Sequence, residues 1–253
     1  MCYNEVIDKG RFITFFNFYK IFLFGVNALK HISVAIDGPV GAGKSTIARA
    51  AAKRLGFVYC DTGALYRAVG LYCLRNGADM GDGTLIAGKL PEISVEIRLL
   101  DGVQRVFLNG ADVSEDIRMP EVSMAASTVS AVPEVRAALL DLQRSVAEKN
   151  SVIMDGRDIG TVVLPNADVK IFLTASPEIR AKRRFDELVA KGVEVVFEDV
   201  LEDLQKRDYN DSHRDAAPLK QAEDAVLADT SGLDFEQSVE LVCKIIQNKT
   251  DTT

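Results

Sequence analysis

The sequence has few of the residues that common metal and nucleic-acid sites use. It contains no tryptophan, only two histidines, and four cysteines that lie far apart with no C-x-x-C pair. We therefore expect neither a zinc site nor a disulfide framework, and reduced cysteines are typical of a cytoplasmic protein. Acidic residues also outnumber basic ones. The chain has 37 aspartates and glutamates and 30 lysines and arginines, which gives a net charge of −7. A chain of this charge is not expected to bind a nucleic-acid polymer.

The remaining composition is that of an ordinary globular protein. The 253 residues are 47% hydrophobic and 26% charged, and only seven are proline and 18 glycine. These values exclude collagen-like, low-complexity and intrinsically disordered chains. The length suits one α/β domain, or a core with a small inserted lobe.

The first thirty residues differ in composition from the rest. Six of the 12 phenylalanines lie between Phe12 and Phe24, within an apolar run from Phe12 to Leu29. This run reaches the lower limit for a membrane span, but Lys20 lies near its middle. Three interpretations stay open: an extension loosely attached or upstream of the true start, a segment that packs on the folded body or a partner, and a targeting or membrane segment. We favour the first, and expect no membrane association.

From residue 31 the chain alternates short apolar runs with amphipathic segments. The runs that predict buried strands are 31–36, 57–60, 151–154, 169–173 and 225–228. The segments that predict helices are 44–55, 64–75, 133–149, 177–190, 198–207 and 235–247. An alternation of strand and helix is typical of an α/β fold built on a parallel sheet.

One stretch breaks this alternation. Residues 93–100 and 103–108 alternate in polarity around Asp101-Gly102, a pair that favours a two-residue hairpin turn. A second turn is expected at Asn109-Gly110. The stretch predicts a small antiparallel sheet in an inserted lobe of about 89–128, separate from the parallel core.

The residues after the first strand carry the strongest motif. Gly38 to Ser45 match G-x-x-x-x-G-K-[ST], with a strand before and a helix after. Glycines let backbone N–H groups turn towards phosphate oxygens, the lysine reaches the β- and γ-phosphates, and the serine hydroxyl reaches Mg²⁺. The residues expected to bind ATP are Gly38, Pro39, Val40, Gly41, Ala42, Gly43, Lys44, Ser45 and Thr46.

A second strand ends in a carboxylate. The run 151–154 leads into Asp155, as in the Walker-B strand that places an aspartate near the metal. Ser45 and Asp155 are therefore the expected Mg²⁺ ligands.

A GTPase is the first alternative. Asp229-Thr-Ser-Gly232 and Asn248-Lys-Thr-Asp251 match the D-x-x-G and N-K-x-D patterns of that class. The second lies within the last six residues, with no strand to hold it against a base, and the first follows the phosphate loop by nearly 190 residues. We interpret both as chance matches.

A phosphotransferase must hold two anions together, so it needs a second cationic site and an arginine-rich lid. Arg67 and Arg157 follow strand ends, and Arg214 closes the polar stretch 207–214, which we interpret as a lid-like loop. The lid is expected at about 180–217. His213 is expected to be a solvated neighbour, since phosphoryl transfer needs little acid–base chemistry.

At this point the chain resembles the bacterial cytidylate kinases, from about residue 32 to 248. The segments that carry the resemblance are the phosphate loop through Thr46, Asp61-Thr-Gly-Ala-Leu-Tyr-Arg67, 155–163, 170–175, and 207–219 with Ala217-Pro-Leu219. The resemblance implies a P-loop nucleoside-monophosphate kinase fold with a five-stranded parallel core, helices on both faces, a lid, and an enlarged monophosphate lobe that carries the antiparallel insertion. It also implies Mg²⁺-dependent transfer from ATP to CMP or dCMP, in pyrimidine nucleotide metabolism.

The resemblance further implies roles for single residues. The acceptor phosphate would be held by Thr62, Arg67 and Arg157, and the cytosine by Ser127, Arg136 and Asp158. Arg207 and Asp211 would contact the sugar, and Arg214 the phosphates. Lys44, Arg157 and Arg214 would be the catalytic residues.

In total, we expect a kinase domain over residues 31–248 and a short tail at 249–253. We expect the protein to be cytoplasmic and monomeric. Two alternatives stay open: a kinase for another small acceptor, and a P-loop binding or switch protein that hydrolyses nucleotide slowly.

Overall fold

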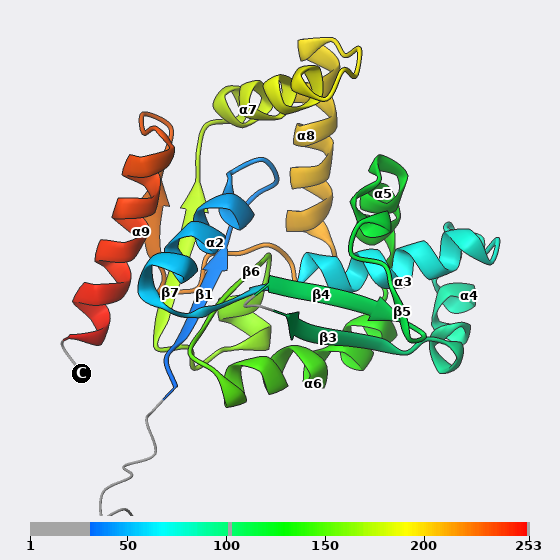
Figure 1. Ribbon diagram of the computed structural model, residues 1–253. Coiled ribbons are helices and arrows are strands. Elements are labelled where there is room, and N and C mark those ends of the chain that lie inside the picture. The colour runs from blue at the N-terminus through cyan, green and yellow to red at the C-terminus, as the bar shows by residue number, and fades with distance from the viewer. Residues whose placement is uncertain (1–30, 101–102, 252–253) are drawn as a thin grey trace, which may run out of the picture. The chain divides into compact units, whose positions relative to one another are not determined.

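The computed structural model describes residues 31–100 and 103–251 (Figure 1). The N-terminal extension and the hairpin turn at Asp101-Gly102 lie outside the described residues. Their expected roles therefore stay predictions.

The core is a five-stranded sheet in which all neighbouring strands run parallel. Its strands, in spatial order, are β2 (Val58–Asp61), β6 (Val152–Gly156), β1 (Ser33–Asp37), β7 (Val169–Thr174) and β8 (Val226–Asp229). The five apolar runs of the sequence thus form the expected sheet. In the sheet, β2 and β6 lie on one side of β1, and the later strands β7 and β8 lie on the other. The carboxyl end of β1 is therefore a topological switch point, the place where such sheets bind ligands.

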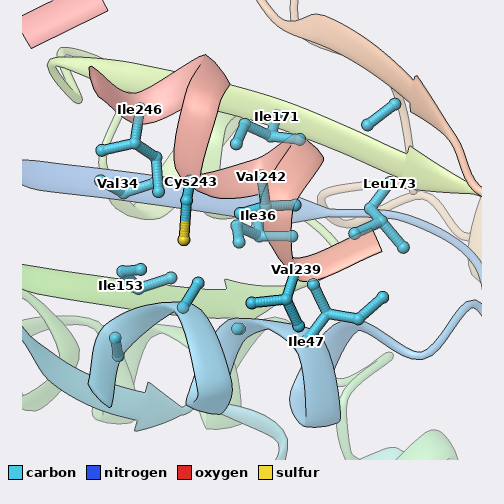
Figure 2. Close-up of a cluster of buried hydrophobic side chains, with 14 of the residues drawn as sticks. Val34, Ile36, Ile47, Ile153, Ile171, Leu173, Val239, Val242, Cys243 and Ile246 are labelled. Carbon is cyan, nitrogen blue, oxygen red and sulfur yellow. The ribbon is translucent and has the colours of Figure 1, made fainter. Parts of the chain in front are cut away.

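Helices cover both faces of this sheet, as the sequence predicted. On one face α2 (Lys44–Leu55) and α9 (Phe235–Thr250) pack on alternate strand residues, among them Ile36, Ile153 and Leu173 (Figure 2). On the other face the intervening strand residues meet α6 (Pro133–Lys149) and a five-residue π-helix, η3 (Ile159–Val163). Strands buried on both faces explain the continuous apolar runs.

The antiparallel sheet also forms where the sequence places it. β3 (Val95–Leu100) pairs with β4 (Val103–Leu108), which pairs with β5 (Ala111–Asp112). Between β4 and β5, Asn109 and Gly110 have φ values of 49° and 82°, as a type I′ turn requires.

Several helices accompany this sheet. α3 (Gly63–Arg75) forms as expected and packs on α5 (Pro120–Val129), with the short α4 (Gly83–Gly88) nearby in sequence. Two 3₁₀ turns, Leu90–Glu92 and Asp116–Arg118, complete this part of the chain. α4 and α5 are additional to the predicted helices; α4 has only six residues and begins and ends with glycine, a poor helix former.

The prediction of a lid-like loop at 207–214 is wrong. α7 (Pro177–Ala190) has the predicted bounds, but α8 (Phe197–His213) continues six residues past the predicted end, and Arg214 is its C-cap. Tyr209 stacks on exposed His213 one turn later, with ring centroids 4.0 Å apart. The last two turns carry mainly polar side chains that pair with other polar groups, so they lack the apolar period that marks a helix.

Among the described residues, no helix combines the length and apolarity needed to cross a membrane.

The burial of the core predicts that two leucines on neighbouring strands contribute very differently to the stability of the fold. Leu173 of β7 is 0% exposed, whereas Leu227 of β8 is 57% exposed. Leu173→Ala should lower the free energy of unfolding by about 2–5 kcal/mol, because it leaves a cavity. Leu227→Ala should change it by less than about 1 kcal/mol. Urea unfolding of both variants measures the difference. Equal losses in the free energy of unfolding would show that Leu173 is not part of the buried core.

Candidate functional site

The phosphate loop lies at the switch point, between the end of β1 and the start of α2. Gly38, Gly41 and Gly43 have φ values of 152°, 73° and 83°, which side chains disfavour. At Gly38 a Cβ atom would lie 2.0 Å from the carbonyl oxygen of Leu173, so only glycine fits there. Gly43 is the N-cap of α2, and Thr46 lies in its first turn. The loop therefore presents backbone N–H groups at a helix N-terminus, which favours an anion.

Lys44 is a buried cation in this loop. Its Nζ donates to the carbonyl oxygen of Pro39 at 2.7 Å. Burial, together with the nearby Arg157 guanidinium, lowers the pKa of Lys44 to about 7. A polyphosphate beside the ammonium would favour its charged form.

Ser45 and Asp155 lie together, as the sequence predicted. The Ser45 hydroxyl donates to Asp155 Oδ2 at 2.7 Å, and the Tyr59 hydroxyl donates to Oδ1 at 3.0 Å. Burial, and then the charge of Asp61, raise the pKa of Asp155 to about 6. A hydroxyl and a carboxylate are hard oxygen ligands of the kind that Mg²⁺ takes, so these residues fit that ion. The described residues hold no cluster of three or more His, Cys, Asp or Glu for a metal. A magnesium ion that is shared with phosphates needs only one or two protein ligands.

A second anion-binding geometry lies at the start of α3. Thr62 is the N-cap of this helix, and its hydroxyl donates to the carbonyl oxygen of Asp155 at 2.8 Å. Arg67, one turn later, pairs with Asp61 at 2.5 Å. The Nε of Arg67 is buried with no hydrogen-bond partner among the described residues. An anion at this helix N-terminus would therefore find both the helix dipole and a guanidinium.

Arg157 connects the end of β6 with helix α8. Its Nε donates to Asp211 Oδ2 at 2.7 Å. Arg207, one helical turn before Asp211, lies 3.9 Å from Asp203. Burial, and then the charge of Arg157, lower the pKa of Arg207. The side chains of Arg207 and Arg157 are only 23% and 25% exposed, and an anionic ligand would offset their charge.

Asp158 is buried between two other guanidiniums. Arg136 of α6 pairs with its Oδ2, and Arg214 NH2 lies 3.8 Å from its Oδ1. Ser130, which follows α5, holds both arginines: its carbonyl accepts from Arg136 at 3.1 Å and its hydroxyl from Arg214 at 3.3 Å. Ser127 lies one turn earlier in α5, and its carbonyl accepts from the Ser130 hydroxyl at 2.8 Å.

The predicted site residues therefore form one continuous region. Arg214 NH1 lies 4.0 Å from Asp211 Oδ1, which joins the Asp158 cluster to Arg157. Asp37, directly before the phosphate loop, accepts from the backbone N–H of Ile159, the residue after Asp158, at 2.7 Å, so this cluster adjoins the phosphate loop. Guanidinium groups from α6, the end of β6 and the C-cap of α8 meet at Asp158 and Asp211, and Arg67 of α3 lies beside Asp61 at the end of β2.

Sequence reasoning missed Asp37, the last residue of β1. Its buried carboxylate accepts from the backbone N–H groups of Ile159 and Gly160, each at 2.7 Å. Burial raises the pKa of Asp37 to about 6. These bonds hold the segment with Arg157 and Asp158 against the start of the phosphate loop. The only sequence signal was the position of Asp37 directly before Gly38.

The two GTPase-like matches lie in different parts of the fold, and the first lies near the phosphate loop, because Arg183 donates to the carbonyl oxygens of Ala42 and Thr230 at 3.4 and 2.8 Å. Asp229 ends β8, and its side chain accepts from the backbone and hydroxyl of Ser231. Asn248 lies in the last turn of α9. The Asp229 carboxylate is bound within its own turn, and the second match begins inside a helix and not in a loop that follows a strand, which agrees with their interpretation as chance matches.

Comparison with known proteins agrees with this geometry. The family model described as "Cytidylate kinase" matches residues 34–248. The chain is 51% identical over 225 residues to a cytidylate kinase of Caldicellulosiruptor bescii, covering 87% of this chain and 100% of that one. It is 51% identical over 218 residues to a cytidylate kinase of Carboxydothermus hydrogenoformans, covering 86% and 98%. The solved structure of an uncharacterized protein from Eubacterium ventriosum shares the fold, with a TM-score of 0.50, 12% identity, and coverage of 86% and 99%.

The burial of Asp158 predicts a large effect on stability. Its side chain is 6% exposed, whereas that of Asp203 on α8 is 52% exposed. Asp158→Asn should lower the free energy of unfolding by about 3 kcal/mol, because two buried guanidiniums lose their countercharge. Asp203→Asn is the matched control and should cost less than about 1 kcal/mol. Equal losses in thermal or urea unfolding would show that the Asp158 pairs are not buried.

Proposed function

The chain belongs to the cytidylate kinase family, and from that premise we propose that it transfers the γ-phosphoryl group of ATP to CMP or dCMP. The products are ADP and CDP or dCDP. The observation that carries the proposal is the buried arginine cluster beside the phosphate loop, which gives one polyphosphate and one monophosphate nucleotide adjoining sites. A P-loop protein that only binds or hydrolyses nucleotide does not need this second cationic site.

The phosphate loop is proposed to hold the donor. Backbone N–H groups of residues 41–46 and the Lys44 ammonium contact the triphosphate, since Pro39 has no N–H and the Val40 N–H is bound to Asp208. Ser45 and Asp155 would hold Mg²⁺, which neutralises charge on the phosphates when bound. Tyr59 keeps the Asp155 carboxylate oriented through its hydrogen bond of 3.0 Å.

The arginine cluster is proposed to hold the acceptor. Thr62, Arg67 and Arg157 bind the phosphate of CMP, and the buried Nε of Arg67 is one donor that this phosphate would satisfy. Ser127, Arg136 and Asp158 recognise the base. A carboxylate accepts from the exocyclic amine of cytosine and repels the carbonyl oxygen that uracil has there. Arg207 and Asp211 contact the sugar.

Transfer needs alignment and charge neutralisation more than proton chemistry. An oxygen of the CMP phosphate forms a bond to the γ-phosphorus, and the bond from that phosphorus to the bridging oxygen breaks, so the electron pair leaves with ADP. The attacking phosphate oxygen is already ionised, so no general base and no covalent enzyme intermediate are required. Lys44, Arg157 and Arg214 stabilise the charge on the transferring group.

The proposal extends to the organisation of the chain. Residues 31–248 are the kinase domain, with a monophosphate lobe at about 89–128 and a lid at about 180–217. The protein acts as a cytoplasmic monomer. Two observations support this: one chain supplies every proposed site residue, and Cys60, Cys73 and Cys243 are buried and unpaired among the described residues.

The function is tested by an ADP-release assay across acceptors. CMP and dCMP should be phosphorylated with a kcat/KM at least tenfold above those of UMP, AMP, GMP and shikimate, because Asp158 selects the amine of cytosine. Removal of Mg²⁺ with EDTA should stop turnover. A tenfold preference for UMP would contradict the substrate assignment. ADP release that no acceptor stimulates would contradict a kinase altogether.

Arg157 provides a test at the level of one residue. Arg157→Ala should lower kcat by about 100-fold or more while ATP binding persists, because the variant loses a cation at the transferring group. Arg54→Ala is the matched control, since Arg54 lies on α2 and pairs with Glu236 and Glu240 at the surface. Its turnover should stay unchanged. Normal turnover in Arg157→Ala would remove this residue from the proposed site.

A further inference from the structure

Two side chains of the lid helices bind the backbone of a single residue of the phosphate loop, Val40, on both sides of its Cα atom. Asp208 of α8 accepts from the backbone N–H of Val40 with its Oδ1 at 3.2 Å. Arg180 of α7 donates to the carbonyl oxygen of Val40 at 2.8 Å. The two side chains also pair with each other, with Arg180 NH1 2.6 Å from Asp208 Oδ2. Both polar groups of Val40 are therefore bound by one ion pair.

This ion pair is anchored in the core. The Nε of Arg180 donates to the carbonyl oxygen of Ala175 at 2.9 Å, directly after β7. The Arg180 side chain is 5% exposed and that of Asp208 22%. A charge-assisted pair that is so well shielded has little freedom to move and keeps its geometry.

The backbone next to Val40 fits tightly against the same helices. A Cβ atom at Gly41 would lie 3.1 Å from Leu204 Cδ1 of α8 and 3.2 Å from Arg180 Cβ of α7. There is thus no free space between the phosphate loop and the lid helices at this point. The position of one fixes the position of the other.

Helix α8 also carries residues that face the acceptor. Asp211, three residues after Asp208, holds Arg157, and Arg214 caps the helix beside Asp158. Arg207 is the residue before Asp208. The contact at Asp208 therefore lies between the donor loop and the side chains proposed for the acceptor.

We propose that Asp208 and Arg180 are positioning residues, which hold α8 in register with the phosphate loop and so align the acceptor with the γ-phosphate of the donor. We name this pair and its two bonds to Val40 the P-loop clasp. The inference rests on the proposed function and deepens it. The clasp acts through alignment, on which the rate of in-line transfer depends steeply. Each nucleotide alone keeps all its binding residues when the clasp is lost.

The test replaces the Asp208 carboxylate by a carboxamide. Asp208→Asn should lower kcat for CMP about tenfold to 100-fold, while the Kd values of ADP and of CMP, each measured alone by calorimetry, stay within about threefold of wild type. Glu202→Gln is the matched control, since Glu202 is an exposed carboxylate on the same helix. It should leave all three values unchanged.

A merely structural role gives a different result. In that case Asp208→Asn would lower the unfolding temperature while kcat at 25 °C stayed within about twofold of wild type, and the clasp would be refuted. A tenfold loss of affinity for either nucleotide alone would also refute it, because binding would then explain the slower rate.

A double-mutant cycle tests whether the two residues act as one unit. Arg180→Lys keeps the buried charge but cannot make the three bonds of the guanidinium. If the clasp is a unit, Arg180→Lys and the double variant with Asp208→Asn should have kcat values within about twofold of Asp208→Asn. If the double variant instead shows the product of the two single losses in kcat, the two residues act independently, which would contradict the pair. Should Asp208→Asn not fold, Arg180→Lys is measured in its place, with the same outcomes for kcat and the two Kd values.

Wild-type turnover separates the two proposals. A wild-type protein that transfers nothing to CMP contradicts the proposed function. A wild-type protein that transfers normally, with an Asp208→Asn variant that does the same, contradicts only the clasp.

Discussion

The pairing of buried guanidiniums with a few buried carboxylates is the interaction on which the rest of this structure depends. Arg136 and Arg214 share Asp158, and Asp211 lies between Arg214 and Arg157. Without these carboxylates the positive charges would repel one another, and their burial would destabilise the fold. With them, the cations are already oriented when an anionic substrate arrives. Such preorganisation is the main way in which a protein stabilises a charged transition state.

The topology of the sheet explains how these charges meet. β1, β2 and β6 are parallel, so the phosphate loop, Thr62 and Arg157 all follow carboxyl ends at the same edge. Helices α7 and α8 follow β7, at that edge too, and lie beyond the sheet (Figure 1). The strand order reverses at β1, which leaves a place there for a ligand. One parallel sheet thus brings together, from distant parts of the chain, the residues that we propose for the donor and acceptor sites.

Backbone contacts keep these parts in register. Asp37 binds two N–H groups at the start of η3, and the P-loop clasp binds both polar groups of Val40. In each case a charged side chain on one segment satisfies the main chain of another. Because the partner is a peptide group, such a contact fixes the position of the loop itself. The phosphate loop, the Arg157 segment and α8 are therefore joined by direct hydrogen bonds.

The sequence by itself determined the phosphate loop, the five strands and the bounds of several helices, since local signals define them. α2 ends at Gly56, whose φ of 71° suits a C-cap, and α6 begins with Pro133. Only the tertiary structure decided which carboxylate pairs with which arginine, that α8 runs to His213, and that Asp37 and Asp208 serve the loop. These pairings join residues far apart in the chain, where no periodic pattern records the partner. A polar helix face that packs against charges leaves no apolar period to read.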